Sequence, residues 1–151
     1  MELKKYCGRF PSILQQAFRD GKAVIPQSDD TRCVSYIYVA TEAYRAIDVN
    51  DDKPNITQYD FESRVEREIR EGKFKSLPKG FTYYSCSCFF TEQKLLEKVT
   101  DLKNKIIKGK SKIAKGTLKF RNGPILVNKK KGHIDWFLFE KADVVGDFEF
   151  I

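Results

Sequence analysis

The sequence predicts an α+β fold, with a helical N-terminal half packed on a mainly antiparallel C-terminal sheet. Apolar residues of the first half recur at intervals of three and four, as on the buried face of a helix, whereas almost everything after Gly109 reads as short strands separated by turns. Because no internal repeat and no linker interrupt the chain, we expect residues 1–151 to form one globular domain. A chain of 151 residues buries roughly 70% of the surface that it exposes when unfolded, so it needs no disulfide or metal to hold it together.

The first predicted helix lies between Pro11 and Gly21. Proline is favoured at the first position of a helix and glycine just after its end. Four apolar residues between them fall on one helical face: Ile13, Leu14, Ala17 and Phe18. The sequence therefore predicts a short amphipathic helix close to the N-terminus.

Two further helices are expected before residue 73. Asp29 or Asp30 can cap the second, whose apolar residues recur at helical spacing: Cys33, Ile37, Ala40, Tyr44 and Ile47. Residues 34–39 also fit a buried strand, but the spacing favours a helix. The third helix has the cleanest amphipathic pattern, with Phe61, Val65 and Ile69 repeating every four residues before Gly72.

The second half of the chain predicts one more helix among strands. After a turn at 77–80, the aromatic run Phe81–Phe90 predicts a buried strand. Thr91 then caps a helix that ends at Gly109, with Leu95, Leu96, Val99, Leu102 and Ile106 on its apolar face. Segments 113–121 and 124–128 flank Asn122-Gly123, a hairpin signal, and 133–140 and 147–151 supply two more strands.

Charge is distributed unevenly along the chain. Lys103–Lys131 holds eleven basic residues and no acidic one, whereas 16 basic residues balance 16 acidic ones up to Leu102. Such a segment either keeps the protein soluble or contacts a polyanion, and we expect it to contact nucleic acid or an acidic protein surface. Most of these basic residues are lysines, which contact phosphates and not particular bases, so we expect binding to nucleic acids of many base sequences. The predicted nucleic-acid-binding residues are Lys105, Lys108, Lys110, Lys112, Lys115, Lys119, Arg121, Lys129, Lys130 and Lys131.

The aromatic residues allow two interpretations. They make up 13% of the chain, and some of them can form a base-stacking platform beside the basic segment, as in proteins that bind single strands. Core packing is the simpler interpretation, because aromatic side chains in strands bury large areas. The residues concerned are Tyr36, Tyr38, Tyr83, Tyr84, Phe89, Phe90, Phe120, Phe137 and Phe139.

His133 is the only histidine and a weak candidate for a general base. In an extended segment its imidazole shares a face with the carboxylate of Asp135, a pairing that raises the basicity of histidine. Nucleophiles occur only far away in sequence, at 85–88, where two serines alternate with two cysteines. The alternative is that His133 begins a surface strand whose Trp136 and Leu138 enter the core.

No motif in the sequence indicates a cofactor or a metal, so we predict neither. The run Lys108-Gly109-Lys110-Ser111 lacks the earlier glycine of a P-loop, because Asn104 stands there. The four cysteines lack zinc-ligand spacing, and we expect them to be reduced. No apolar run has the length of a membrane span or of a signal peptide, so we expect a cytoplasmic protein without membrane contact.

Three short segments resemble one enzyme family. Arg9, Ser85-Cys86-Ser87 and Asp147-Phe148-Glu149 follow the order of the motifs in the arginine–serine–glutamate class of ADP-ribosyltransferases. The family usually has Thr where Cys86 stands, and Glu or Gln where Asp147 stands. The resemblance implies an enzyme that uses a nicotinamide dinucleotide, with Arg9, Ser85 and Ser87 as binding residues and Glu149 stabilising the positively charged ribose.

Overall fold

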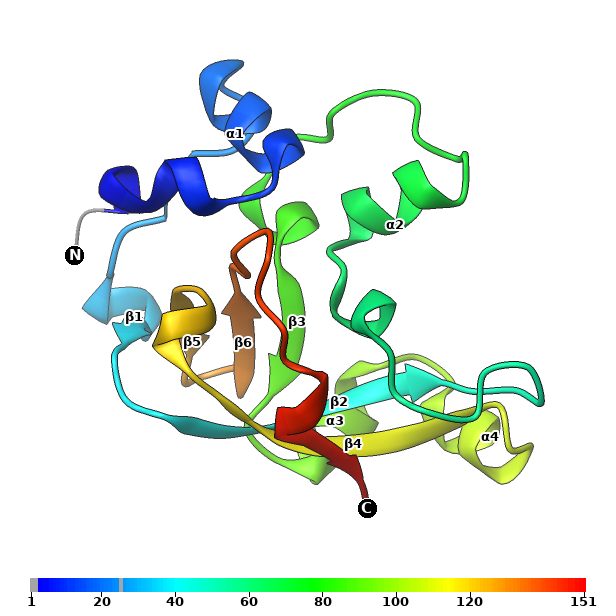
Figure 1. The fold of residues 1–151 in the computed structure, drawn as a ribbon. Helices are drawn as coiled ribbons and strands as arrows, with labels where there is room; N and C mark the ends of the chain where they lie inside the picture. The colour runs from blue at the N-terminus through cyan, green and yellow to red at the C-terminus, as the bar shows by residue number, and fades with distance from the viewer. Residues whose placement is uncertain (1–2, 25) are drawn as a thin grey trace.

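A seven-stranded antiparallel sheet forms the centre of the computed structural model, which describes residues 3–24 and 26–151. The strand order is β1-β5-β6-β3-β2-β4-β7. One helix precedes the strands along the chain and three lie between them, which confirms an α+β fold (Figure 1). The helices are α1 (Ser12–Arg19), α2 (Arg64–Arg70), α3 (Glu92–Lys98) and α4 (Leu102–Ile107). The strands are β1 (Val34–Ile37), β2 (Thr41–Asp48), β3 (Cys86–Phe89), β4 (Ser111–Leu118), β5 (Ile125–Asn128), β6 (His133–Trp136) and β7 (Phe148–Phe150).

The second predicted helix is wrong, because residues 34–48 form strands β1 and β2. The Asp29 side chain does accept a hydrogen bond from the Thr31 amide, but the 3₁₀ turn that it caps ends after three residues, at Cys33 in a left-handed conformation (φ 57°). Strand β2 then pairs with β4 along its whole length, from Thr41 to Asp48. The apolar spacing of this segment fits a helix as well as a strand, and pairing with distant strands decides between them. The N-terminal half is therefore not purely helical.

The helix ends predicted from glycines are confirmed at α1 and α2, and α2 also has a cap that the sequence interpretation did not name. Helix α1 ends just before Gly21, which adopts a φ of 70°. Helix α2 begins with a capping box, in which the Ser63 side chain accepts from the Glu66 amide and Glu66 accepts from the Ser63 amide. It ends before Gly72, which also has a φ of 70°. Both signals are local to the helix that they delimit.

The segment after Thr91 differs from its prediction in one respect. Thr91 caps α3 as expected, but the chain leaves the helix at Val99, and Asp101 takes a left-handed conformation (φ 63°) before α4 begins. Gly109 (φ 70°) follows the end of α4. The break lets the apolar side chains of both short helices pack on one sheet face, where Leu95, Leu102 and Ile113 are buried together.

The predicted hairpin around Asn122-Gly123 is wrong. Strand β4 lies between β2 and β7, whereas β5 lies between β1 and β6, so the two strands do not pair. The connection contains a 3₁₀ turn, Phe120–Asn122, and then Gly123 with a φ of 146°. Gly123 lies against the backbone of Phe137 and Leu138, where no side chain fits. Glycine is needed at position 123 because two backbones pack closely there, and not because a two-residue turn requires it.

The core lies on both faces of the sheet. One face buries Cys86, Cys88, Ile134 and Trp136, and Trp136 is fully buried as the sequence predicts. The other face packs against α1 and its neighbours in one cluster and against α3 and α4 in another. The aromatic segment forms a 3₁₀ turn, Phe81–Tyr84, and only then β3. Among the described residues, no helix combines the length and the apolar character needed to cross a membrane.

Candidate nucleic-acid interface

The basic segment is distributed over four elements. Lys105, Lys108 and Lys110 lie on α4 and just after it, and Lys112 and Lys115 lie on β4. Lys119 and Arg121 lie in the connection to β5, and 129–131 form the turn between β5 and β6. Figure 1 shows α4 and the β5–β6 turn at opposite ends of the sheet. The segment is therefore not one continuous face.

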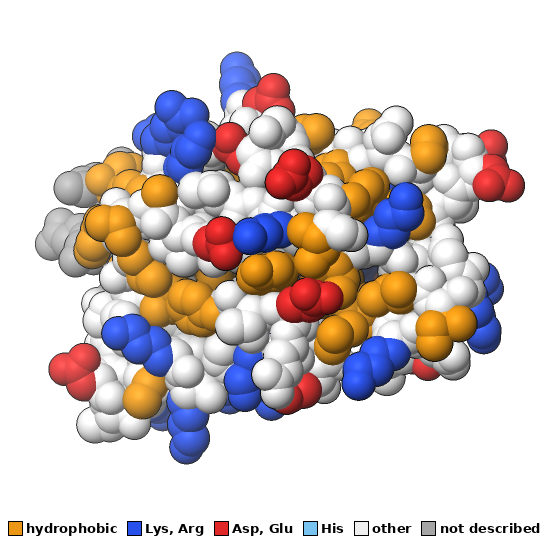
Figure 2. Space-filling model, turned by 90° about the horizontal axis from the view of Figure 1, so that it is seen from below, with side chains coloured by type: hydrophobic (Ala, Val, Ile, Leu, Met, Phe, Trp, Pro, Cys, Tyr) orange, Lys and Arg blue, Asp and Glu red, His pale blue; other side chains and the backbone are white. Residues whose placement is uncertain are grey.

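Two of these lysines already have acidic partners. Lys115 Nζ lies 3.4 Å from Glu42 Oε2, and this carboxylate raises the pKa of the Lys115 ammonium. Lys119 Nζ donates to Asp147 Oδ1 at 3.0 Å. On the face of the molecule seen in Figure 2, Lys and Arg side chains alternate with acidic and hydrophobic ones. The lysines and arginines without an acidic partner among the described residues lie at the two ends of the segment, at Lys112 and at Arg121.

Arg121 lines a pocket of about 550 Å³ together with Arg9. Three segments that are distant in sequence form this pocket: the end of the 3₁₀ helix Leu3–Arg9, the turn Phe120–Asn122, and the chain from 139 to 143. Two backbone hydrogen bonds hold them together, from the Glu140 amide to the Arg9 carbonyl at 2.8 Å and from the Phe139 amide to the Asn122 carbonyl at 2.9 Å. The walls of the pocket are thus set by the backbone.

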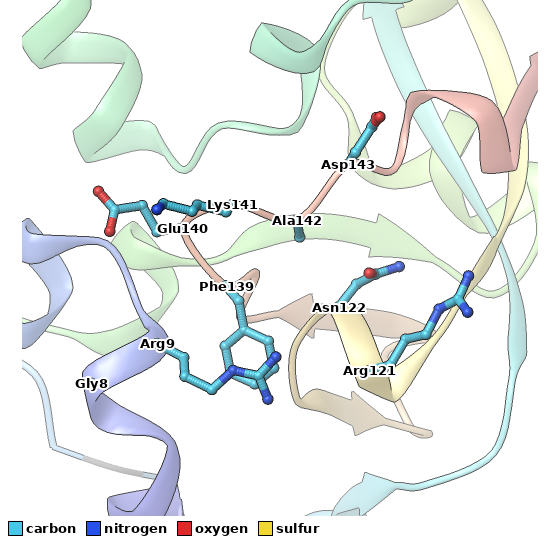
Figure 3. A pocket seen from close by; sticks show the side chains of 9 residues that line it. All are labelled: Gly8, Arg9, Arg121, Asn122, Phe139, Glu140, Lys141, Ala142 and Asp143. Atoms are coloured by element: carbon cyan, nitrogen blue, oxygen red, sulfur yellow. The ribbon is translucent and has the colours of Figure 1, made fainter.

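The two arginines of this pocket make no ion pair with the two carboxylates, Glu140 and Asp143, that also line it. Within the described part of the chain neither Arg9 nor Arg121 forms an ion pair, and both side chains are exposed. The Arg9 guanidinium instead lies 3.9 Å from the centre of the Phe139 ring, a cation–π contact. Figure 3 shows Asn122 between the Phe139 ring and Arg121, whereas the Glu140 carboxylate points away from both arginines.

Asn122 adds an unused hydrogen-bond donor to the pocket. Its Nδ2 atom is buried and has no hydrogen-bond partner among the described residues. A buried donor without an acceptor costs about 1–3 kcal/mol, and an oxygen atom from a ligand would remove that cost. The donor and the two guanidinium groups together offer hydrogen bonds suited to phosphate oxygens.

A row of aromatic rings continues from this pocket to the surface. Phe139 lies 6.1 Å from Tyr6, Tyr6 lies 5.9 Å from Phe120 in an edge-to-face arrangement, and Phe120 lies 5.3 Å from Tyr38, measured between ring centres. Tyr38 is 55% exposed, although large hydrophobic side chains usually avoid water. We call these four rings, together with Arg9, Arg121 and Asn122, the aromatic–arginine site.

The enzyme candidates from the sequence lie in three different surroundings. Arg9 stacks on Phe139, and the pocket that it lines contains neither serine nor Glu149. Glu149 is exposed on the edge strand β7, opposite Lys115 in the register. Strands β2 and β4 separate β7 from β3, so about 14 Å separates the backbones of β3 and β7 at roughly 4.8 Å per strand interval.

Ser87 instead meets His133, which begins β6 as predicted, and Ser85 meets Asp135 on the same strand. Ser87 Oγ lies 2.5 Å from His133 Nε2, and His133 Nδ1 lies 3.6 Å from Asp135 Oδ2. Ser85 Oγ donates to Asp135 Oδ1 at 2.6 Å. The structure thus brings together the histidine, the carboxylate and the serines that the sequence offers as separate candidates.

Comparison with known proteins finds no matching family model, no similar curated protein and no similar solved structure. Among the described residues, no cluster of three or more His, Cys, Asp or Glu side chains is placed to hold a metal ion. The sequence interpretation included Arg9, Arg121 and three of the four aromatic residues but did not join them. It did not include Tyr6, and it considered Asn122 only as part of a turn. No local signal connects these segments, because their contacts are made across the fold.

Proposed function

We propose that this protein binds nucleic acid, and single strands in particular, at the aromatic–arginine site. One observation carries the proposal: two arginines without a carboxylate partner flank a pocket that continues into a row of aromatic rings ending at an exposed Tyr38. Arginine guanidinium groups bind phosphate through paired hydrogen bonds, and aromatic rings stack on unpaired bases of any sequence. The site offers both kinds of contact side by side.

The lysines of the basic segment add a long-range contribution. Those around α4 and in the β5–β6 turn are exposed and attract a polyanion without contacting particular bases. Duplex DNA keeps its bases stacked inside, so only the single strand uses the aromatic rings. This difference favours a single strand over a duplex of the same length.

The enzyme alternative, an ADP-ribosyltransferase-like activity on a nicotinamide dinucleotide, requires Arg9, the two serines and Glu149 to touch one ligand. Their positions in separate surroundings favour the binding function over this alternative. An acidic protein partner would use the same cations, but it would leave the exposed ring of Tyr38 without a role.

Fluorescence anisotropy with a labelled oligothymidylate tests the proposal. Lys141 also lines the pocket. If Arg9, Arg121 and Lys141 each neutralise one phosphate, the logarithm of the affinity falls with the logarithm of the salt concentration with a slope of about −2, from roughly 0.7 per phosphate of a single strand. Arg121→Gln should make the slope shallower by about 0.7. Tyr38→Ala should lower the affinity about tenfold, since one stacked base contributes about 1–3 kcal/mol.

Lys75→Gln is the matched control, because Lys75 is exposed and lies outside the site. It should change the affinity far less than Arg121→Gln does. No binding at low salt, or equal losses in Lys75→Gln and Arg121→Gln, would contradict the proposal. A saturable complex with an acidic protein, with little affinity for the oligonucleotide, would assign the cations to a protein partner instead.

A further inference from the structure

A chain of polar side chains crosses from β3 to β6 at the centre of the sheet. The antiparallel register places Ser87 opposite Asp135 and Phe89 opposite His133. Since side chains of a strand alternate between faces, Ser87, His133 and Asp135 all point to the same face, and Cys86, Cys88 and Trp136 point to the other. Ser85 precedes β3 by one residue and continues this alternation. The register therefore sets the order of contacts along this face, from Ser87 through His133 and Asp135 to Ser85.

The geometry orients the imidazole for proton transfer. Ser87 Oγ and His133 Nε2 share a short hydrogen bond of 2.5 Å, in which Nε2 accepts when the ring proton is on Nδ1. Nδ1 faces Asp135 Oδ2 at 3.6 Å, so the carboxylate favours that tautomer. The Phe89 ring meets the imidazole edge-to-face, with 5.1 Å between the ring centres, and limits its rotation.

Ser87 and His133 are more exposed to solvent than Asp135 and Ser85, which hold the histidine in place. The Asp135 side chain is only 10% exposed, and its other oxygen accepts the hydrogen bond from Ser85, which is also buried. The His133 side chain is 24% exposed, and Ser87 is half-buried. Leu126 on β5 lies opposite Asp135, so the carboxylate is buried beside an apolar side chain. Burying a charge there lowers the stability of the fold, whereas an apolar residue at position 135 would not. The cost has a function if the buried carboxylate orients a histidine that solvent can reach.

We infer that Ser87 and His133 form a nucleophile and general-base pair that transfers acyl groups from carboxylic esters, with Asp135 and Ser85 as positioning residues. Ser87 Oγ adds to the ester carbonyl carbon while its proton moves to His133 Nε2. The carbon–oxygen bond to the alcohol then breaks, and the leaving alcohol takes that proton. Water next adds to the acyl group on Ser87 and gives a proton to His133. The bond to Ser87 breaks, Oγ regains the proton, and the free carboxylic acid leaves.

The surroundings indicate which esters fit. A hollow of about 510 Å³ adjoins the start of β6, and Gly132, the residue before His133, forms part of its wall with Phe90, Lys94 and Lys129. The Phe90 amide donates to the Gly132 carbonyl at 3.0 Å, so this wall is fixed to the strand that carries His133. Lys94 Nζ lies 3.6 Å from Glu97 Oε2, whereas Lys129 is exposed and in no ion pair among the described residues. One aromatic side chain and the Lys129 ammonium suit an ester with a short apolar chain that ends in a carboxylate or phosphate.

Hydrolysis of 4-nitrophenyl esters tests the inference, with the acetate as the neutral ester and the glutarate as the anionic one. The intact protein should release 4-nitrophenol from both, with a higher kcat/KM for the glutarate, and mass spectrometry should find the acyl group on Ser87. Ser87→Ala should abolish acylation, and His133→Asn should lower kcat about 100-fold or more. Asp135→Asn should lower kcat and leave KM nearly unchanged, as expected of a residue that acts through the histidine.

Two further variants keep the result interpretable. Ser35→Ala removes a serine of the edge strand β1 and should leave the rate unchanged. Ser87→Cys retains a nucleophile of similar size, and its alkylation by iodoacetamide should be slower when His133 is also replaced by Asn. Circular dichroism shows whether each variant is folded. The inference is overturned if the wild-type protein acquires no acyl group, or if folded Ser87→Ala hydrolyses both esters at the wild-type rate. Oligonucleotide binding should be the same in Ser87→Ala, so this test is independent of the proposed binding function.

Discussion

Replacement of Gly123 by alanine should destabilise the fold more than the same replacement at any other glycine in the loops that connect the strands. An added Cβ would lie 2.8 Å from Leu138 Cα and closer still to the Phe137 carbonyl oxygen, and neither atom can turn aside as a flexible side chain can. The φ of 146° adds backbone strain, because residues with a Cβ rarely adopt it. Strain of about 1–3 kcal/mol and overpacking of about 1–3 kcal/mol sum to roughly 4 kcal/mol.

A loss of that size is measurable by thermal denaturation. For a domain of this length, 1 kcal/mol corresponds to about 2–4 °C, so the Tm should fall by roughly 10 °C. Gly123 also accepts a hydrogen bond from Trp136 Nε1 at 3.3 Å and follows Asn122 in the aromatic–arginine site, so the variant should bind oligonucleotide more weakly. Gly146→Ala is the control, because an added Cβ there meets nothing within 4 Å. If the two variants unfold at the same temperature, the close packing assigned to Gly123 does not exist.

Two more predictions concern stability and reactivity. Burial raises the pKa of Glu66 above its ordinary 4.5, so the folded protein holds this proton more tightly than the unfolded chain, and the contribution of Glu66 to stability falls as the pH rises above 4.5. Glu66→Gln keeps an acceptor for the Ser63 amide and should raise the Tm at pH 7 but not at pH 4, whereas an equal gain at both would exclude a charge effect. The chain has four cysteines and no disulfide among the described residues: Cys33 is exposed, Cys7 is half-buried, and Cys86 and Cys88 are buried. In a Cys7→Ser background, Ellman's reagent should therefore react quickly with Cys33 and with Cys86 and Cys88 only after unfolding. Cys33→Ser should remove the fast phase, and rapid reaction of that variant would place the buried pair within reach of solvent.

Local signals predicted the helices well. The Thr91 cap and the glycines at 21, 72 and 109 act on the turn of helix next to them, and the structure has helix boundaries where they predict. Prediction failed for residues 34–48, whose apolar residues suit either a helix or a strand. There the choice depends on β4 and β5, which lie far along the chain and supply the partners.

The candidate sites divide in the same way. The sequence predicted a basic segment, an aromatic excess and the pairing of His133 with Asp135 on one strand face, because these depend on composition and on alternation along a strand. It did not predict that Arg9 meets Arg121 in one pocket, or that Ser87 meets His133.

By itself, the sequence determined the two ends of α1, the start of α3 and the ends of α2 and α4. It also determined that the chain after Gly109 is mainly extended, and which types of side chain are available. Only the tertiary structure decided the strand order, the separation of β4 from β5, and the grouping of functional side chains. The physical reason is that helix boundaries depend on hydrogen bonds between residues a few positions apart. The pairing of strands depends instead on which distant apolar faces are buried together, and that burial is a property of the whole fold.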